Sequence, residues 1–436
     1  MRSIVAVELL RNPVFRRLWF VTMIGGLSVG ATLTTLGWVV VEESGAPLLV
    51  SLVLVTFLAP QMFAGPIGGV LADRYGRGLV IRIGISARLV LAIAMAASLF
   101  WLPHELAPIF VINTVRAVTT GATIPSRRAF MADIVPPRQL TTALALDEFA
   151  ITTTFMAGPI ATGFLLLVLE PGVIFLGLAS ISVIGVFLVP RAPESIQSTA
   201  TGDVATRRRS FIGDLFEGFG YIRRSRVLLG ITAISFTAEL LAFNYMTLIP
   251  VFAKEVFEGG SGLLGVLNGT MPVGELFGAT FMAAFAMRVA KPGRLLMASV
   301  AAIFIVGIPL GASTWLPGTL GLLAIIGGLG QMFFVLTSTL LLRETPPQAR
   351  ARVLGLQQVT WGAGALGGLA SGVLATAFNP HIGIIVPSAI GLAVIIVIIA
   401  VSPKLRSVGG NVAEDEPSQE STDPTVAGAG VNGTGD

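Results

Sequence analysis

The chain has 436 residues, of which 54% are hydrophobic and 12% are charged, whereas about a quarter of the residues in soluble proteins are charged. A water-soluble core cannot absorb so much apolar sequence, so the composition excludes an ordinary soluble domain. Cysteine is absent, which excludes disulfides, thiolate metal sites and a cysteine nucleophile. The two histidines, His104 and His381, fall in short predicted loops, so we expect no metal centre, no catalytic triad and no cofactor.

Apolar runs long enough to cross about 30 Å of hydrocarbon recur along the chain. With charged clusters, proline and glycine as boundaries, the first half has predicted helices at roughly 17–42, 47–72, 79–101, 105–130, 140–168 and 171–189. The second half has six more, at roughly 227–252, 262–287, 295–314, 316–342, 353–377 and 381–401. The sequence therefore predicts an all-α membrane protein with twelve transmembrane helices in two pseudo-symmetric six-helix halves.

The basic residues predict the orientation of these helices. All but three of the 28 lysines and arginines fall in segments that lie on one side of the membrane if the N-terminus is inside, and the exceptions are Lys254, Arg88 and Arg116. Under the positive-inside rule, both termini are therefore expected in the cytoplasm. Because the cations punctuate the apolar runs, the net charge of +4 does not indicate nucleic-acid binding.

Polar segments divide the chain into four expected parts: an N-terminal half over 1–189, a cytoplasmic linker over 190–226, a C-terminal half over 227–401 and a tail over 402–436. The linker becomes amphipathic between Phe211 and Ile222 and has basic flanks, which predicts a helix lying on the membrane surface. The tail is rich in glycine, serine, threonine and acids and is expected to be disordered.

An internal repeat relates the two halves. The segment from Pro136 to Gly158 realigns with the segment from Pro346 to Gly368 at a constant offset of 210 residues. Parallel repeats with a substrate site between them are typical of carriers that rock one half against the other. A chance alignment of apolar helices is the alternative interpretation.

The loop between the second and third predicted helices reads Gly69-Val-Leu-Ala-Asp73-Arg74-Tyr75-Gly76-Arg77-Gly78. It resembles the signature loop of the major facilitator superfamily, G-x-x-x-D-R-x-G-R-[RK], and departs from it only at Gly78. In that family, contacts of this loop latch the two halves together when the carrier opens outward. The resemblance therefore implies a conformational latch made by Gly69, Asp73, Arg74, Gly76, Arg77 and Asp133.

Simple electrostatics supports part of this latch. Asp73 ends a helix at the expected cytoplasmic face, where a carboxylate can sit against the positive N-terminal end of the eleventh helix. Arg77 can pair with Asp133 at the end of the fourth helix. An ordinary turn with a cluster of topogenic cations is the alternative.

Two further stretches resemble parts of the superfamily. The motif Gly158-Pro159-Ile-Ala-Thr162-Gly163 is similar to the G-P-x-x-G-G end of an antiporter motif, from which Thr162 departs. Here Pro159 is expected to kink the helix, and the small residues also fit a pure packing role. The stretch from Pro125 to Leu146 resembles the branch that holds enterobactin exporters, macrolide efflux proteins and multidrug efflux pumps, which implies export of a bulky, partly apolar compound driven by protons.

Ionisable residues inside the predicted spans are functional candidates, because each costs at least about 2.5 kcal/mol in the bilayer. Arg116 lies in the middle of the fourth span, where many proton-coupled relatives carry an arginine. We expect it to act with Asp147 or Glu148, about two turns into the fifth span, as the proton-coupling group. Alternatively, these acids lie at the cytoplasmic end and balance Arg138.

The predicted second half carries Glu239 and Glu275 near the middle of its first two helices. Either residue can carry the proton, meet a cationic substrate or pair with Arg88 for structure. The remaining candidates for the lining of an apolar cavity are the aromatic residues Phe243, Tyr245 and Trp361.

Taken together, the residues and the resemblance imply a monomeric, non-enzymatic secondary transporter in a bacterial cytoplasmic (inner) membrane. Its expected partners are a small-molecule substrate, protons and the lipid bilayer. Proton-coupled export is the first expectation and proton-coupled uptake of a small metabolite is the alternative. A non-transporting sensor and an intramembrane enzyme are remote alternatives, and the enzyme would need a nucleophile or a metal that this sequence lacks.

Overall fold

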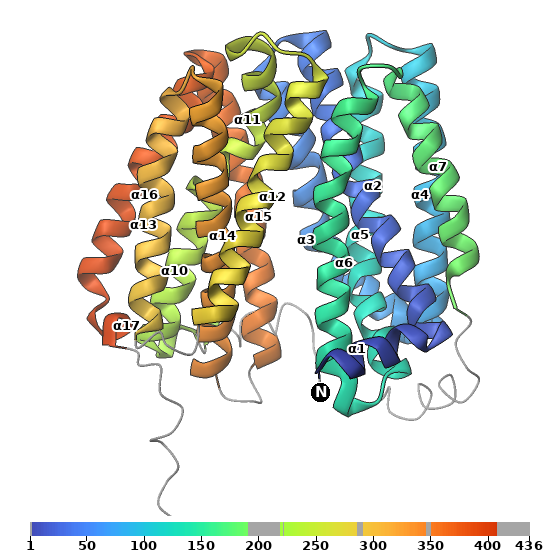
Figure 1. Ribbon diagram of the computed structural model, residues 1–436, viewed down its shortest axis with the longest axis horizontal. Helices are drawn as coiled ribbons and strands as arrows, with labels where there is room; N and C mark the ends of the chain where they lie inside the picture. The colour runs from blue at the N-terminus through green and yellow to red at the C-terminus, as the bar shows by residue number, and fades with distance from the viewer. Residues whose placement is uncertain (1, 191–218, 221, 286–290, 346–349, 408–436) are drawn as a thin grey trace, which may run out of the picture.

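The computed structural model describes residues 2–190, 219–220, 222–285, 291–345 and 350–407, and within these ranges every regular element is helical. Two groups of long helices stand side by side, one from each half of the chain (Figure 1). Helix α1 (Arg2–Arg11) and helix α17 (Pro403–Ser407) lie at the same end of the bundle, which we call the terminal end. Most of the expected surface helix, apart from residues 219, 220 and 222, and most of the expected tail lie outside the described residues.

The first half agrees closely with the six expected spans. Helix α2 begins directly after Asn12, whose side-chain oxygen accepts from Val14 N at 2.9 Å, and ends at Gly45, whose φ of 56° favours glycine. The six long helices of this half are α2 (Pro13–Ser44), α3 (Pro47–Tyr75), α4 (Arg77–Trp101), α5 (Leu106–Ile134), α6 (Leu140–Leu165) and α7 (Pro171–Leu188).

The second half repeats this arrangement with one interruption. The seventh expected span is broken into α10 (Arg226–Leu241) and α11 (Tyr245–Val251), and a π-helical turn over Phe252–Val256 follows. The other long helices are α12 (Ser261–Phe285), α13 (Pro292–Ala312), α14 (Leu316–Glu344), α15 (Arg350–Ala377) and α16 (Pro380–Val401). With α10 and α11 as one broken span, the described residues contain twelve spans.

Eight of these spans are apolar and long enough to cross a membrane by length and composition, counted over the described residues. Helices α5, α6 and α12 are not among the eight, and the described side chains of α15 form a shorter apolar helix over Gly362–Ala377. Helices α6 and α12 pack against each other across the two halves, and α15 packs against α3. A helix that faces another part of the protein needs less apolar surface than one that faces lipid.

The repeat seen in the sequence is also a repeat of structure. Helices α5 and α14 begin 210 residues apart and end 210 residues apart. The packing partners correspond as well: α2 with α6, α3 with α5 and α4 with α7 in the first half match α10 with α15, α12 with α14 and α13 with α16 in the second. Two related halves are therefore confirmed.

The two halves meet along two seams that are very closely packed. In the seam between α6 and α12, a Cβ placed on Gly163 would lie 2.3 Å from Gly265 Cα. In the seam between α3 and α15, a Cβ on Gly372 would lie 2.4 Å from Ser51 Oγ. These contacts lie in the half of the bundle remote from the terminal end, because α3 and α12 begin there.

A lysine also joins the halves at this opposite end. The π-helical turn carries Lys254, whose Nζ donates to Val41 O at 2.9 Å and to Glu42 O at 3.1 Å. Those carbonyls belong to the last turn of α2, where the helix dipole favours a cation. The opposite end of the bundle is thus held closed by both backbone packing and a charged contact.

Candidate functional site

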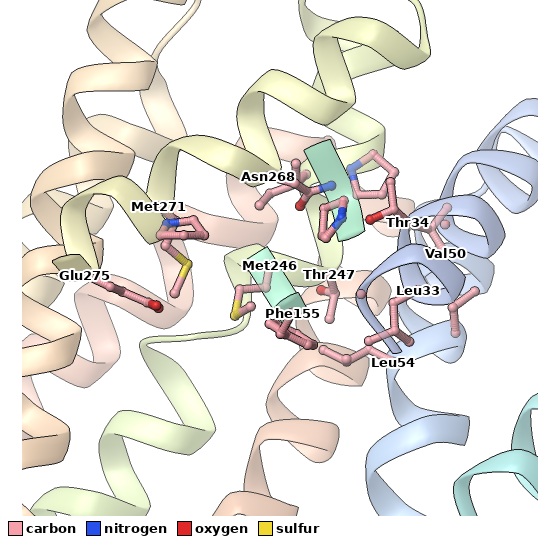
Figure 2. Close-up of a pocket in the computed structure, with 17 residues that line it drawn as sticks. Leu33, Thr34, Val50, Leu54, Phe155, Met246, Thr247, Asn268, Met271 and Glu275 are labelled. Carbon is pink, nitrogen blue, oxygen red and sulfur yellow. The ribbon is translucent and has the colours of Figure 1, made fainter. Parts of the chain in front are cut away.

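A cavity of about 120 Å³ lies between the two halves. Its walls come from α2, α3 and α6 of the first half and from α11 and α12 of the second. Figure 2 shows Leu33, Thr34, Val50 and Leu54 on one side of the cavity and the α12 side chains on the other. The wall is mostly apolar, and its polar side chains are Thr34, Thr247, Asn268 and Glu275.

Among the described residues that line this cavity, Glu275 carries the only carboxyl group. It comes from the middle of α12, where it lies near Met271 (Figure 2). It forms no hydrogen bond or ion pair with the residues that the structure describes. A carboxylate surrounded by apolar groups is complementary to a cationic group of a ligand.

Glu239 lies close by but does not line the cavity. It is in the last turn of α10, its exposed fraction is 7%, and its Oε1 has no hydrogen-bond partner. A Cβ placed on Gly364 of α15 would lie 3.8 Å from Glu239 Oε2 and 4.0 Å from Leu58 Cδ1 of α3. This carboxyl group therefore lies where helices of both halves meet.

The break between α10 and α11 follows directly after Glu239. Thr247 N donates to Asn244 O at 3.1 Å, a short-range bond typical of a tight turn. The amide oxygen and nitrogen of the Asn244 side chain are both buried without partners. Interrupted helices within transmembrane bundles are tolerated where they line protein-enclosed sites.

The aromatic candidates take other places than the sequence suggested. Phe243 stacks on Phe334 at a centroid distance of 5.6 Å, and Tyr245 is fully buried with its hydroxyl 3.2 Å from Met271 Sδ. Neither residue lines the cavity between the halves, so the expectation for Phe243 was wrong, whereas Tyr245 lines a second, smaller apolar cavity of about 20 Å³ within the second half. Both rings fill the core of the second half, where apolar burial outweighs exposure to the cavity. The side chain of Trp361 lies outside the described residues.

The predicted partnership of Arg116 with an acid of α6 was wrong. Asp147 is buried and pairs with Arg127, and its Oδ1 also accepts from the Thr22 hydroxyl at 2.8 Å. Arg116 instead donates to Ser28 O at 2.6 Å and to Ser28 Oγ at 3.1 Å. Because Arg127 lies 20 positions before Asp147, close to the loop that joins α5 to α6, it reaches the acid before Arg116 can.

Glu148 takes no part in this buried contact. It pairs with Arg128 at 3.2 Å, and both side chains are largely exposed, at 62% and 47%. Adjacent positions on a helix differ by about 100°, so Asp147 and Glu148 face opposite environments. The pairing of either acid with Arg138, the structural alternative, is not among the ion pairs of the described residues.

The signature loop has the geometry expected for its second half. Arg77 Nη1 lies 2.5 Å from Asp133 Oδ1 and 3.0 Å from Ala129 O. Gly76 joins α3 to α4 with φ of 90°, a conformation that side chains other than glycine rarely adopt. The side chain of Asp73 lies outside the described residues, Arg74 lies 5.5 Å from the centre of the Tyr75 ring, and a Cβ placed on Gly69 would meet no atom within 4 Å.

The glycines of the motif in α6 are packing positions. A Cβ on Gly158 would lie 2.7 Å from Leu27 O of α2, so this residue lets two helices of the first half approach closely. Gly163 does the same across the seam to Gly265. Pro159 lines the cavity.

Sequence reasoning missed the two buried arginines that matter most besides Arg116. The cation pattern predicts that Arg127 lies at the membrane face with other basic residues, but it lies in the core with an exposed fraction of 8%. Arg88 was considered as a partner for Glu239 or Glu275, but it lies in the first half and interacts electrostatically with Arg127. The one feature of the sequence that could have indicated a buried Arg127 is Asp147, which follows it on the next helix and could pair with it.

Comparison with known proteins identifies the family to which this architecture belongs. Residues 18–365 match the family model described as Major Facilitator Superfamily. The enterobactin exporter EntS of Salmonella typhimurium is 27% identical over 72% of this chain and 76% of its own, and the multi-drug resistance efflux pump PmrA of Streptococcus pneumoniae is 23% identical over 75% and 79%. The staphyloferrin A transporter of Staphylococcus aureus is 26% identical over 55% of this chain, and that match spans only 59% of its length.

Solved structures agree at the level of the fold. The nucleoside transporter NupG aligns with a TM-score of 0.69 over 89% of this chain and 98% of its own, at 16% identity. A D-xylose-proton symporter aligns with a TM-score of 0.71 over 91% and 99%, at 14% identity. Since the family model covers most of the chain and the fold agrees from end to end, the chain belongs to the Major Facilitator Superfamily, whose members are transporters and not enzymes.

Proposed function

We propose that this chain is a proton-coupled exporter of small, partly apolar compounds, and that they bind in the cavity between the two halves. The observation that carries the proposal is the composition of the cavity wall. Apolar side chains such as Leu33, Val50 and Phe155 surround one carboxyl group and a few neutral polar groups. Such a wall suits a compound with a large apolar surface and a few polar groups.

The direction of transport is supported by relatives. An enterobactin exporter and a multidrug efflux pump are among the similar proteins, and the similarity covers about three quarters of this chain. The motif that ends in Gly163 resembles that of antiporters. Uptake of a small metabolite remains the alternative, because the name of the staphyloferrin A transporter implies no direction.

Alternating access requires that contacts at one end form as those at the other break. The seams and Lys254 close the opposite end in this conformation. We assign the latch of the other conformation to the signature loop, which the contact of Arg77 with Asp133, both in the first half, already holds at the junction of α3 and α4 in this conformation. The cation distribution supports a cytoplasmic location for the terminal end. We propose the boundaries 1–189, 190–226, 227–401 and 402–436 for the first half, the linker, the second half and the tail.

We assign the coupled proton to Glu239. A buried carboxyl group without a partner at Oε1 is more stable neutral than charged. Its place between α15 and Leu58 of α3 means that relative movement of the halves changes its access to water. Asp147 is a weaker candidate because its carboxyl group is bound to Arg127 and Thr22 within the first half, away from the cavity and the seams.

Transport by purified protein in proteoliposomes tests the proposal. An imposed pH gradient should drive accumulation of one or more compounds in a panel of macrolides, tetracyclines, dyes and siderophores. Glu239→Gln should abolish accumulation driven by the gradient while exchange of substrate across the membrane continues. The reason is that glutamine mimics the protonated glutamate and cannot release a proton.

Glu255→Gln is the matched control, since Glu255 is exposed at the opposite end. Gradient-driven accumulation that survives Glu239→Gln and fails in Asp147→Asn or Glu148→Gln would return the proton to α6. Accumulation only with the gradient reversed would establish uptake, and no flux of any compound would contradict the transport proposal.

A further inference from the structure

One face of α2 is lined by arginines. Thr22, Gly25 and Ser28 are three residues apart, so they lie along one side of the helix at steps of about 4.5 Å. Arg127 Nη1 donates to Thr22 Oγ1 at 2.5 Å, and Arg116 donates to Ser28. Between them, a Cβ placed on Gly25 would lie 3.3 Å from Arg88 Nη1. We call Arg127, Arg88 and Arg116, with this face of α2, the arginine ladder.

The ladder carries more positive charge than its surroundings neutralise. Its three guanidinium groups come from α4 and α5, and the carboxylate that contacts them is Asp147 of α6, bound to Arg127. Arg88 forms no hydrogen bond or ion pair with described residues, and Arg116 contacts only uncharged groups of Ser28. The charges of Arg88 and Arg127, and those of Arg88 and Arg116, also repel one another.

Burial makes this excess charge costly. The exposed fractions of Arg88 and Arg116 are 7% and 2%, and Arg88 Nε and Arg116 Nη1 are buried donors without an acceptor. Arginine stays protonated in proteins, so it cannot escape the cost by losing its proton. An uncompensated buried charge costs several kcal/mol, which a bound counter-ion offsets.

The space beside Gly25 suits such a counter-ion. Among the atoms around a Cβ built on Gly25, only Arg88 Nη1 lies within 4 Å. Any larger residue would fill this space. None of the three arginines lines the cavity between the halves, whose α2 wall begins at Gly30. A bulky substrate in that cavity therefore does not touch the ladder.

We propose that the arginine ladder binds one small monovalent inorganic anion, of the size of chloride, between Arg88 and Arg116 beside Gly25. Arg88 Nη1, which lies 3.3 Å from a Cβ placed on Gly25, donates to it, and Arg116 supplies a second positive charge nearby. The anion holds α4 and α5 against α2 in the first half. This site is separate from the export proposal, because it depends on neither the cavity nor the direction of transport.

Binding of radioactive chloride to the purified full-length protein tests the site. The wild-type protein should bind chloride saturably, at about one ion per chain, with competition by bromide and nitrate and none by gluconate. Arg88→Gln and Arg116→Gln should each weaken binding about tenfold or more, because each removes a positive charge. Arg128→Gln is the control, since Arg128 is exposed and pairs with Glu148.

A second variant leaves every charge in place. Gly25→Ala puts a methyl group into the proposed site and should weaken chloride binding, whereas Gly177→Ala, where no atom lies within 4 Å, should not. Chloride should also raise the Tm of the wild-type protein relative to gluconate at equal ionic strength, and the rise should disappear in Gly25→Ala. Absence of saturable binding in the wild type, or unchanged binding in both Gly25→Ala and Arg116→Gln, would overturn the proposal.

Discussion

The two halves share one architecture but differ in the charge of their interiors. In the first half, the buried charged side chains are three arginines and one aspartate; in the described part of the second, Glu239 is buried and Glu275 is half-buried in the cavity wall. The positions 210 residues after the first-half group carry no charge: Ala298, Ile326, Thr337 and Gln357. The two halves therefore pack alike but differ in their interior charges: arginines with one aspartate in the first half, and carboxyl groups in the second.

This difference separates structural from functional charge. Most buried ionised groups of the first half are bound to other groups of the same half, as in the contact of Arg127 with Asp147 and Thr22, and only Arg88 lacks a hydrogen-bond partner among the described residues. The carboxyl groups of the second half have no such partners and lie at the cavity or at a seam. Charges that are fixed in place stabilise a rigid body, whereas unpaired carboxyl groups can change their protonation or bind a ligand.

The strongest test of this comparison is Asp147→Asn. It leaves Arg127 buried without its carboxylate and should destabilise the first half by about 3 to 5 kcal/mol. A large fall in the Tm of the purified protein, followed by circular dichroism, is the expected result. Glu148→Gln should change stability by less than about 1 kcal/mol, since its ion pair is exposed. Equal Tm values for Asp147→Asn and wild type would show that the buried pair does not stabilise this half.

A substitution in the seam between α6 and α12 tests whether the two halves separate there as rigid bodies. Gly163→Ala places a methyl group 2.3 Å from Gly265 Cα, where both neighbours are backbone. It should cost about 1 to 3 kcal/mol in the conformation closed at the opposite end, as other overpacked sites do. Because the chain has no cysteine, labelling of a single introduced cysteine at Thr34 reports opening without background.

Gly177→Ala is the matched substitution, since it meets nothing within 4 Å. Labelling at Thr34 should rise in Gly163→Ala and stay at the wild-type level in Gly177→Ala. An unchanged labelling rate in both variants would mean that the close contact at Gly163 does not stabilise the conformation closed at the opposite end.

The smallest expected effect concerns ligand charge in the second half. Glu275→Gln should raise the KM for a cationic dye about tenfold, a loss of about 1.4 kcal/mol of binding, and leave the KM for a neutral compound unchanged. The reason is that Glu275 carries the only carboxyl group among the described residues of the cavity wall. Equal changes for charged and neutral compounds would assign Glu275 to the shape of the cavity rather than to charge recognition.

The sequence predicted the spans well and the contacts of the charges poorly. Long apolar runs, bounded by cations and prolines, mark helix ends directly, and expected and observed ends agree within a few residues. The signature spacing also led to the contact of Arg77 with Asp133. The break at Asn244 was missed because neither glycine nor proline marks it; its turn depends on tertiary packing around Phe243.

The choice of partners among arginines could not be predicted for a different reason. Arg116, Arg127 and Arg128 all lie on α5, and which of them faces α6 depends on how the two helices cross. Residues 11 apart on a helix point in nearly the same direction, so periodicity does not distinguish Arg116 from Arg127. Depth along α6 decides the pairing, and that depth comes only from the folded structure.

The close seams also determine from which side of the bilayer an apolar compound reaches the cavity. At Gly163 and Gly372, backbone and side-chain atoms of the two halves touch, so no acyl chain or drug passes between them in that leaflet. Entry from the membrane is then restricted to the leaflet at the terminal end, where partitioning has already concentrated apolar compounds. A fluorescent lipid-like probe should therefore be extracted from that leaflet alone, and equal extraction from both leaflets would contradict this sidedness.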